Sequence, residues 1–192
     1  MKRALIRLAA IPVALLMVGI ADAETYQIDA THSSIDFAIR HLVGRTKGRF
    51  AEFSGTIVYD PAAPEAMSIN GTIQVNSLDT GNEKRDGHLK SGDFFGAEEF
   101  PTITFVSTQV EEKGDKLQVS GTFTMHGVSK QVSLLVQILG TGVHPRNKKQ
   151  QIGLATEFTV KASDYGVNSW ENFSAILGDE VDIEVLIEAN AG

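Results

Sequence analysis

The segment DKLQVSGTFTM, residues 115–125, places a large apolar side chain at almost every second position. Leu117, Val119, Phe123 and Met125 therefore lie on one face of an extended chain. Side chains of a β-strand alternate between the two faces of the sheet, so this spacing predicts a strand with one buried face and one face in water.

The same period of two recurs along most of the chain. The segments are SIDFAIR at 34–40, AEFSGTIVYD at 51–60, SINGTIQVN at 68–76, PTITF at 101–105, KQVSLLVQI at 130–138, QIGLATEFTV at 151–160 and DEVDIEVLIE at 179–188. With a short first strand at 25–28, the chain is expected to form eight or nine strands. Residues 82–95 and 168–176 have a helical composition, but neither stretch is long enough for the crossover helices of a parallel sheet. We therefore predict an all-β, antiparallel fold.

A sandwich and a closed barrel both accommodate this number of strands. The repeats SGTI at 54–57, NGTI at 70–73 and SGTF at 120–123 favour the barrel. Each repeat puts a glycine two residues before a large apolar side chain on the inward face, and glycine in a strand marks a bend or a close approach of other atoms. Gly55, Gly71 and Gly121 are thus expected to let the sheet coil or to keep its interior open.

The first 23 residues are typical of a secretory signal peptide. Lys2, Arg3 and Arg7 precede an uncharged apolar run at 8–20 that is short for a membrane span, and Ala21-Asp22-Ala23 has the pattern of a cleavage site. We expect residues 1–23 to be removed before Glu24, residues 24–192 to form one domain, and the protein to reside in the periplasm without a membrane span.

Charge and composition exclude several functions. The chain has a net charge of −7 and no cysteine. Loss of the leader removes three positive charges and one negative charge, which leaves a formal charge of −9. Nucleic-acid binding depends on clustered Lys and Arg, so no nucleic-acid partner is expected. The lack of cysteine also excludes thiol catalysis and the cysteine-based zinc patterns.

The five histidines give no catalytic or metal-binding signature. They lack His-Glu-x-x-His spacing, and G-x-S-x-G, Ser-x-x-Lys, G-x-G-x-x-G and P-loop patterns are all missing. His41 extends the apolar face of Ile35, Phe37 and Ile39, so it is expected at the mouth of the barrel. We predict no catalytic residue, no metal site and no cofactor. The alternative is a hydrolase or isomerase that acts on a lipid-like substrate through His41 or His88.

Three segments together resemble the YceI-like family of secreted, lipocalin-like polyisoprenoid-binding proteins. They are HSSIDFAIRHLVGRTKGRFAEFSGTI at 32–57, SLDTGNEKRDGHLKSGDFFGAEEFPTITF at 77–105 and GTFTMHGVSKQVSL at 121–134. The final third departs from the family pattern, because Ala162 stands where many members carry an arginine. The resemblance implies an extended eight-stranded antiparallel barrel around an apolar tunnel. It also implies a long-chain ligand, such as a prenyl quinone, a polyprenyl phosphate or a similar lipid.

The inward faces and the 82–95 segment supply the candidate ligand-binding residues. A short helix with large apolar residues between two strands is suited to cover one opening of the barrel, with His88 holding it in place through a hydrogen bond and Arg85 and Lys90 near an anionic head group. The candidate residues are Phe37, Ile39, His41, Phe53, Ile57, Ile73, Leu89, Phe94, Phe95, Ile103, Phe105, Phe123, Leu134, Val136 and Phe158. The sequence leaves open the chain length and head group of the lipid, whether the protein transports, stores or senses it, and whether the protein forms a homodimer.

Overall fold

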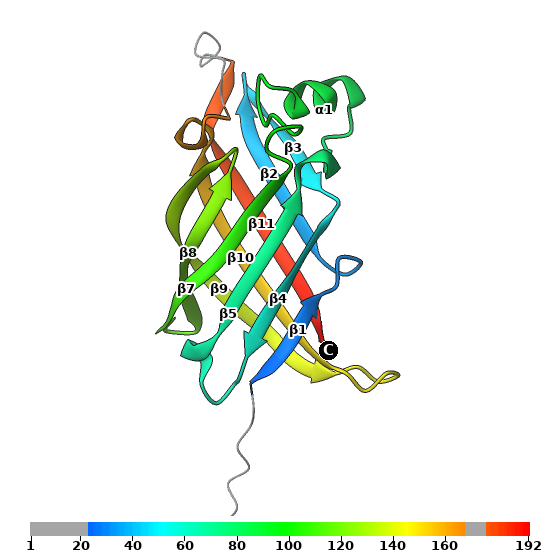
Figure 1. The fold of residues 1–192 in the computed structure, drawn as a ribbon, viewed down its shortest axis with the longest axis vertical. Coiled ribbons are helices and arrows are strands. Elements are labelled where there is room, and N and C mark those ends of the chain that lie inside the picture. Colours follow the sequence, from blue (N-terminus) through cyan, green and yellow to red (C-terminus); the bar gives the residue numbers. More distant parts are fainter. Residues whose placement is uncertain (1–22, 168–175) are drawn as a thin grey trace, which may run out of the picture.

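A computed structural model describes residues 23–167 and 176–192. Within these ranges the chain is mostly strand (Figure 1). The strand segments are β1 (Glu24–Ile28), β2 (Ser34–His41), β3 (Gly44–Phe50), β4 (Phe53–Tyr59), β5 (Ser68–Gln74), β6 (Leu78–Asp79), β7 (Thr102–Lys113), β8 (Lys116–Met125), β9 (Val128–Val143), β10 (Gln150–Lys161) and β11 (Leu177–Ala191). The helices are α1 (Glu83–Lys90) and three short 3₁₀ turns, η1 (Pro64–Ala66), η2 (Val75–Ser77) and η3 (Ala162–Tyr165).

These segments form a closed antiparallel barrel of eight long strands, which confirms the predicted fold class. Three of the long strands are interrupted, and they consist of β1 with β2, β3 with β4, and β5 with β6. Both halves of each interrupted strand bond to the same neighbouring strand. Closure occurs along β11, where Val185 lies opposite Ile35 of β2 and Ala189 lies opposite Ile28 of β1.

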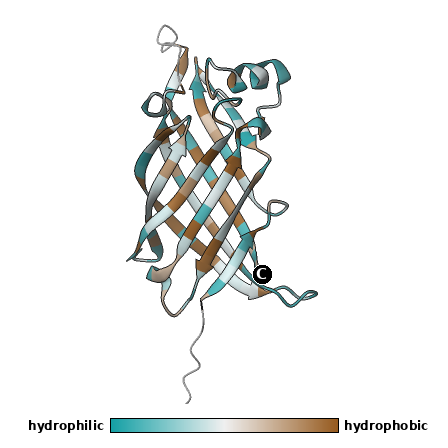
Figure 2. Cartoon of the chain, in the orientation of Figure 1, coloured by the Kyte–Doolittle hydropathy of each residue, from teal (hydrophilic) through white to brown (hydrophobic). Residues whose placement is uncertain are grey.

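The apolar positions of the alternating pattern face the inside of this barrel, and the polar positions face its outside. In β8 the predicted inward residues Leu117, Val119, Phe123 and Met125 are buried, as is Gly121 on the same face, and the residues of the other face are only partly buried. Apolar and polar bands accordingly alternate along the strands (Figure 2). The strands therefore form because one face of each is removed from water.

The three repeated glycines divide between the two expected roles. A Cβ atom on Gly121 would lie 2.5 Å from the carbonyl oxygen of Val106 and 2.6 Å from the ring of Phe105. A Cβ atom on Gly55 would clash in the same way with the carbonyl oxygen of Asn70. A Cβ atom on Gly71 would have nothing within 4 Å. Gly55 and Gly121 thus permit close approach, whereas Gly71 keeps the interior open.

Two hydrophobic clusters fill the ends of the barrel. One cluster, at the end near β1 and the C-terminus, includes Tyr26, Tyr59, Met67, Val119 and Ala189. It is tightly packed, since Val119 and Ala189 are 0% exposed. The other cluster lies near α1 and includes the aromatic residues Phe50, Phe94, Phe123 and Tyr165. We call the first end the closed end and the second the α1 end.

Helix α1 is shorter than the 82–95 segment predicted from the sequence. It begins after Asn82, whose side chain accepts a hydrogen bond from the backbone N–H of Arg85, and it ends at Lys90. Ser91 stops the helix because its extended backbone leaves the helical path and its hydroxyl donates to the carbonyl of His88. The chain then turns back on the helix, with the Phe95 N–H donating to the carbonyl of Leu89.

The second predicted helical stretch, 168–176, lies almost wholly outside the described residues, as does the predicted signal peptide apart from its last residue. Across 23–167 and 176–192, we find no helix with the length and apolar character that crossing a membrane requires.

Candidate ligand-binding site

A channel runs inside the barrel, and residues of both hydrophobic clusters line it. Its volume is about 260 Å³, counted as the space open to the centre of a water molecule. Carbon atoms form nearly all of its wall, because the inward positions of the strands are aliphatic or aromatic. Gly71 lies in this wall, where its missing side chain leaves room. The cavity is therefore suited to an apolar guest.

All the residues predicted to bind ligand line this channel. The strands contribute Phe37, Ile39, His41, Phe53, Ile57, Ile73, Ile103, Phe105, Phe123, Leu134, Val136 and Phe158, and the 82–95 segment contributes Leu89, Phe94 and Phe95. The structure thus brings them together around one space. Their contact with a ligand stays a prediction.

Sequence reasoning missed one whole wall of the channel. Val181, Ile183, Val185 and Ile187 of β11 line it, although none was among the candidate residues. Their alternation with Asp182, Glu184 and Glu188 is as regular as that in β8, so the same signal could have identified them. Further missed wall residues include Ile28, Ile35, Phe50, Met125, Leu154 and Val160.

The channel reaches the surface at the α1 end, at a group of residues that we call the mouth. The mouth consists of His41, Thr46, Arg85, Leu177 and Gly178. His41 is exposed here, as expected for the last residue of β2. At the closed end, Ile57, Leu134, Val136 and Leu154 of the cluster line the channel, whereas Tyr26, Tyr59, Met67 and Val119 of the same cluster do not.

Arg85 is held in place at the mouth by the residue that follows β6. Its Nε atom donates to Thr80 Oγ1 at 2.7 Å and its guanidinium donates to the Thr80 carbonyl at 2.8 Å. Asp86 accepts from the backbone N–H of Thr80 at 3.0 Å and from its hydroxyl. These bonds fix α1 against the barrel rim and keep one positive charge beside the channel opening.

The segment after α1 covers part of this end. Phe94 is 6% exposed, and Phe95 packs edge-on against Phe50 of β3 with ring centres 6.1 Å apart. His88 Nε2 lies 3.1 Å from Asp93 Oδ2, and its ring meets Phe94 edge-on at 5.1 Å. The predicted hydrogen bond between His88 and a carboxylate is present, and its role in fixing the segment stays a prediction. The apolar cover comes mainly from Phe94 and Phe95, because α1 itself has no buried residue.

Residues of the cluster at the α1 end are withdrawn from water. Burial raises the pKa of the Tyr165 hydroxyl above its ordinary 10.0, and the nearby Asp164 charge adds to this rise. Tyr165 packs edge-on against Phe123 with ring centres 5.5 Å apart. Ala162, which stands where the family resemblance leads one to expect arginine, is buried and lines the channel, so no charge enters at that point. Such surroundings favour neutral, apolar groups.

One buried hydroxyl interrupts this lining. Within the described ranges, Thr156 Oγ1 on β10 is the buried side-chain polar atom without a hydrogen-bond partner. Thr156 lies in the channel wall opposite Val185 of β11. An activated threonine nucleophile has a base within hydrogen-bond reach, and Thr156 Oγ1 has no such partner among the described residues.

Among the described residues, one cluster carries groups of the type that ligate metals. It consists of Asp29, His32 and Glu188, whose ligand atoms all lie within 4.8 Å of one another. These groups already bond to protein atoms. His32 Nδ1 lies 3.0 Å from Asp29 Oδ2, and the Gln151 side-chain amide donates to Glu188 at 2.9 Å. The cluster is a hydrogen-bonded turn that lies away from the mouth.

A family model, curated relatives and solved structures are all similar to this chain. A family model described as a YceI-like domain matches residues 26–189. A protein named YceI from Salmonella arizonae is 37% identical over 158 residues, which cover 81% of this chain and 82% of the relative. The crystal structure of Burkholderia cenocepacia BcnA superimposes with a TM-score of 0.77 at 26% identity, covering 84% of this chain and 98% of that one.

A second solved structure, at lower identity, is similar to this chain in fold alone. It is a polyisoprenoid-binding domain from Saccharophagus degradans implicated in plant cell wall breakdown, with a TM-score of 0.65 and 21% identity. The superposition covers 87% of this chain and 98% of that domain.

Proposed function

Because the chain belongs to the YceI-like domain family, we propose that it is a periplasmic carrier that holds one long-chain isoprenoid lipid in its channel. The observation that carries this proposal is the apolar channel itself, which is packed at one end and reaches the surface at the other. A prenyl quinone and a polyprenyl phosphate are the ligand classes proposed. The periplasmic location is proposed from the leader-like residues 1–23.

The dimensions of the channel favour a single long chain. Its wall on β11 extends from Leu177 to Ile187, which is roughly 33 Å along a strand. A strand tilt of about 40° reduces this to roughly 25 Å along the barrel axis. One leaflet of a bilayer offers acyl chains only about 15 Å of depth. The channel is therefore longer than an ordinary phospholipid tail requires.

The width of the channel points to one chain rather than two. A volume of about 260 Å³ over that length leaves roughly 10 Å² of cross-section for the centre of a water molecule. Carbon atoms in contact lie about 3.5–4.0 Å apart, so two chains side by side need a wider channel. A single-tailed isoprenoid fits this space better than a two-tailed phospholipid.

We propose binding without catalysis. The enzyme alternative needs convergent titratable groups, yet within the described residues no hydrogen bond pairs His41 with another side chain. His88 packs on Phe94 and pairs with Asp93, so it holds the covering segment. Such an arrangement supports a hydrogen-bonding role for His88 and a rim position for His41.

The Gly71→Leu variant tests the proposal. A leucine at this position would project into open channel, because a Cβ on Gly71 meets no atom within 4 Å. We expect delipidated Gly71→Leu protein to bind a fluorescent isoprenoid at least about tenfold more weakly than the unaltered protein, since the side chain occupies space that the tail needs. Leu186→Ala, on the outer surface of β11, is the matched control and should bind normally. Equal binding by Gly71→Leu and the control would contradict a ligand in this channel.

A further inference from the structure

The turn between β2 and β3 exposes two aliphatic side chains at the α1 end. Val43 is fully exposed and Leu42 is 53% exposed. The tip is held at the start of β11, because the Leu42 N–H donates to the carbonyl of Ile176 at 2.7 Å. These two residues, which we call the tip, adjoin His41 of the mouth.

The backbone conformation at Leu42 is unusual for a leucine. Leu42 has φ +51°, a left-handed conformation that glycine and asparagine adopt most readily. Leucine is an uncommon residue at a left-handed turn position, and here about half of its side chain stays in water. Departures of this kind are expected where a residue serves a function rather than the fold.

The part of the β2–β3 hairpin around the tip is rich in cations, with Asp36 near the start of β2 as the acidic residue of the hairpin, although the whole chain is acidic. Residues 37–51 include Arg40, Arg45, Lys47 and Arg49 and no Asp or Glu, against a net charge of −7 for the chain. Arg45 pairs with Asp182 of β11, and Arg49 pairs with Asp79. Aliphatic side chains next to cations are the pattern that binds anionic bilayers, since burial at the interface and attraction to lipid charge act together.

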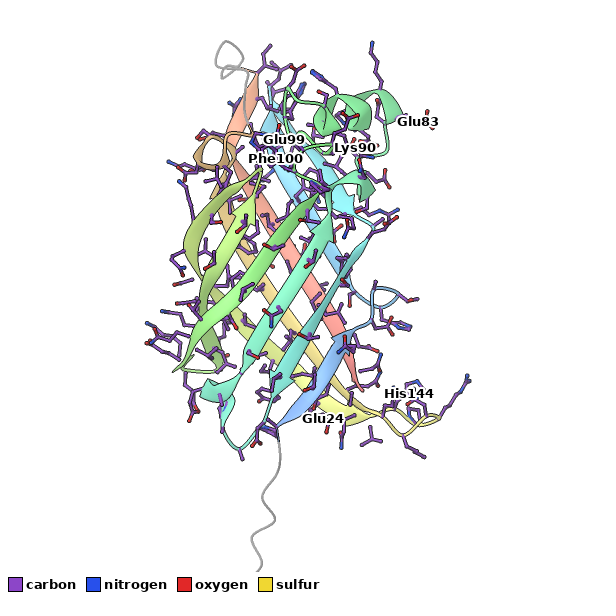
Figure 3. All side chains as sticks on the ribbon, in the orientation of Figure 1. Glu24, Glu83, Lys90, Glu99, Phe100 and His144 are labelled. Atoms are coloured by element: carbon purple, nitrogen blue, oxygen red, sulfur yellow. The ribbon has the colours of Figure 1, made fainter. Side chains whose placement is uncertain are left out.

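The tip lies at the end of the barrel where the channel opens. A second basic hairpin, with Val143 exposed and with Arg146, Lys148 and Lys149, lies at the opposite end of the barrel, where His144 is marked in Figure 3. That end is closed by the packed cluster around Tyr26 and Val119. Of the two exposed basic hairpins in residues 23–167 and 176–192, the Leu42–Val43 hairpin is the one beside the mouth, because His41 and Thr46 line the channel.

We propose that the Leu42–Val43 tip docks the barrel on an anionic phospholipid bilayer, with the mouth facing the membrane during lipid exchange. The role in exchange rests on the proposed lipid-binding function, whereas docking itself does not. The tip inserts Leu42 and Val43 among the head groups, and Lys47 lies near the lipid charge. Docking should weaken as salt is raised, because its electrostatic part is screened.

Flotation with vesicles tests docking directly. The vesicles are phosphatidylcholine with and without phosphatidylglycerol, and the variant is Leu42→Asn/Val43→Asn, in which asparagine suits the left-handed position. We expect the variant to bind phosphatidylglycerol vesicles about tenfold more weakly than the unaltered protein, because it loses two aliphatic anchors. Lys47→Gln should weaken binding to these vesicles and leave binding to pure phosphatidylcholine unchanged. Val143→Asn is the matched control and should bind normally.

Two outcomes would overturn docking by the tip: unchanged flotation of the double variant, or equal loss in Val143→Asn. Val43→Asn alone serves as a folding-neutral check, because the Val43 side chain is fully exposed and its loss should also weaken flotation. Lipid content separates this inference from the proposed function. The double variant should retain bound lipid while releasing it to vesicles about tenfold more slowly. Absence of lipid from every variant would contradict the proposed function, and flotation would still decide whether the tip docks.

Discussion

Gly71 and Gly121 occupy equivalent places in two copies of the same short motif, yet they affect the barrel in different ways. Gly121 lets the ring of Phe105 and the carbonyl of Val106 approach the backbone of β8. Gly71 faces open channel. The two glycines differ in their neighbours. Backbone and ring atoms fill the space beside Gly121, whereas no atom fills the space beside Gly71.

Alanine at these two glycines should separate the two roles. Gly121→Ala should lower the free energy of unfolding by about 1–3 kcal/mol, because the new methyl group meets a backbone oxygen that cannot move aside easily. Gly71→Ala meets nothing within 4 Å and should change stability much less. Urea denaturation followed by circular dichroism measures both. Equal destabilisation by the two variants would contradict the open channel at Gly71.

The Asp29–His32 pair makes the stability of the folded protein depend on pH. The hydrogen bond to Asp29 raises the pKa of His32 above its ordinary 6.5, and the same bond lowers the pKa of Asp29 below its ordinary 3.8. The His32 contribution is complete below pH 6.5 and is lost as pH rises through its raised pKa. The Asp29 contribution is complete above pH 3.8 and is lost as pH falls through its lowered pKa.

The pair should therefore stabilise the barrel most at mildly acid pH, by a small amount because the site is exposed. An NMR titration should give His32 a pKa above 6.5, and Asp29→Asn should return it toward that value. A pKa of His32 at or below 6.5 in the unaltered protein would show that the bond does not form in solution.

At the scale of elements, the strands were predictable and the end of α1 was not. Strand residues such as those of β8 lie between a wet and a dry face, so their alternation is written into the sequence. The end of α1 depends on the Ser91 hydroxyl, which bonds back to the carbonyl of His88. Periodicity does not reveal such a local bond, and so Phe94 and Phe95 were expected within the helix although they lie in the turns beyond it.

Phe94 and Phe95 form the apolar part of the cover, and their truncation tests whether it acts as a lid. In Phe94→Ala/Phe95→Ala, release of a fluorescent isoprenoid should accelerate by about tenfold or more, because mutations that weaken a complex act mainly on its off-rate. The barrel should stay folded, since neither residue belongs to a strand. Stopped-flow release and circular dichroism measure the two effects.

Leu186→Ala is the control for this variant, because Leu186 is 41% exposed on the outside of the barrel. Unchanged release from a folded double variant would remove the lid. Global unfolding would show instead that the two phenylalanines complete the core, as their packing with Phe50 and His88 allows.

At the scale of the whole molecule, the residue patterns predicted eight or nine antiparallel strands and the family resemblance implied an eight-stranded barrel, but alternation does not show whether the interior is hollow. Eight strands can enclose either a filled core or a ligand. The choice depends on the summed volumes of side chains from all walls. Val119 and Ile152 meet partners and are 0% and 1% exposed, whereas Phe37 and Ile73 face the channel. Alternation marks all four as inward and does not distinguish them.

The central claim is that this channel holds one long isoprenoid chain, and its most direct measurement is mass spectrometry of an organic-solvent extract of protein purified without detergent. We expect one single-tailed, long-chain isoprenoid lipid, such as a prenyl quinone or a polyprenyl compound, at close to one molecule per barrel. Gly71→Leu protein prepared in the same way should yield far less of it. An extract without lipid, from protein whose channel also fails to take up added isoprenoid, would contradict the claim.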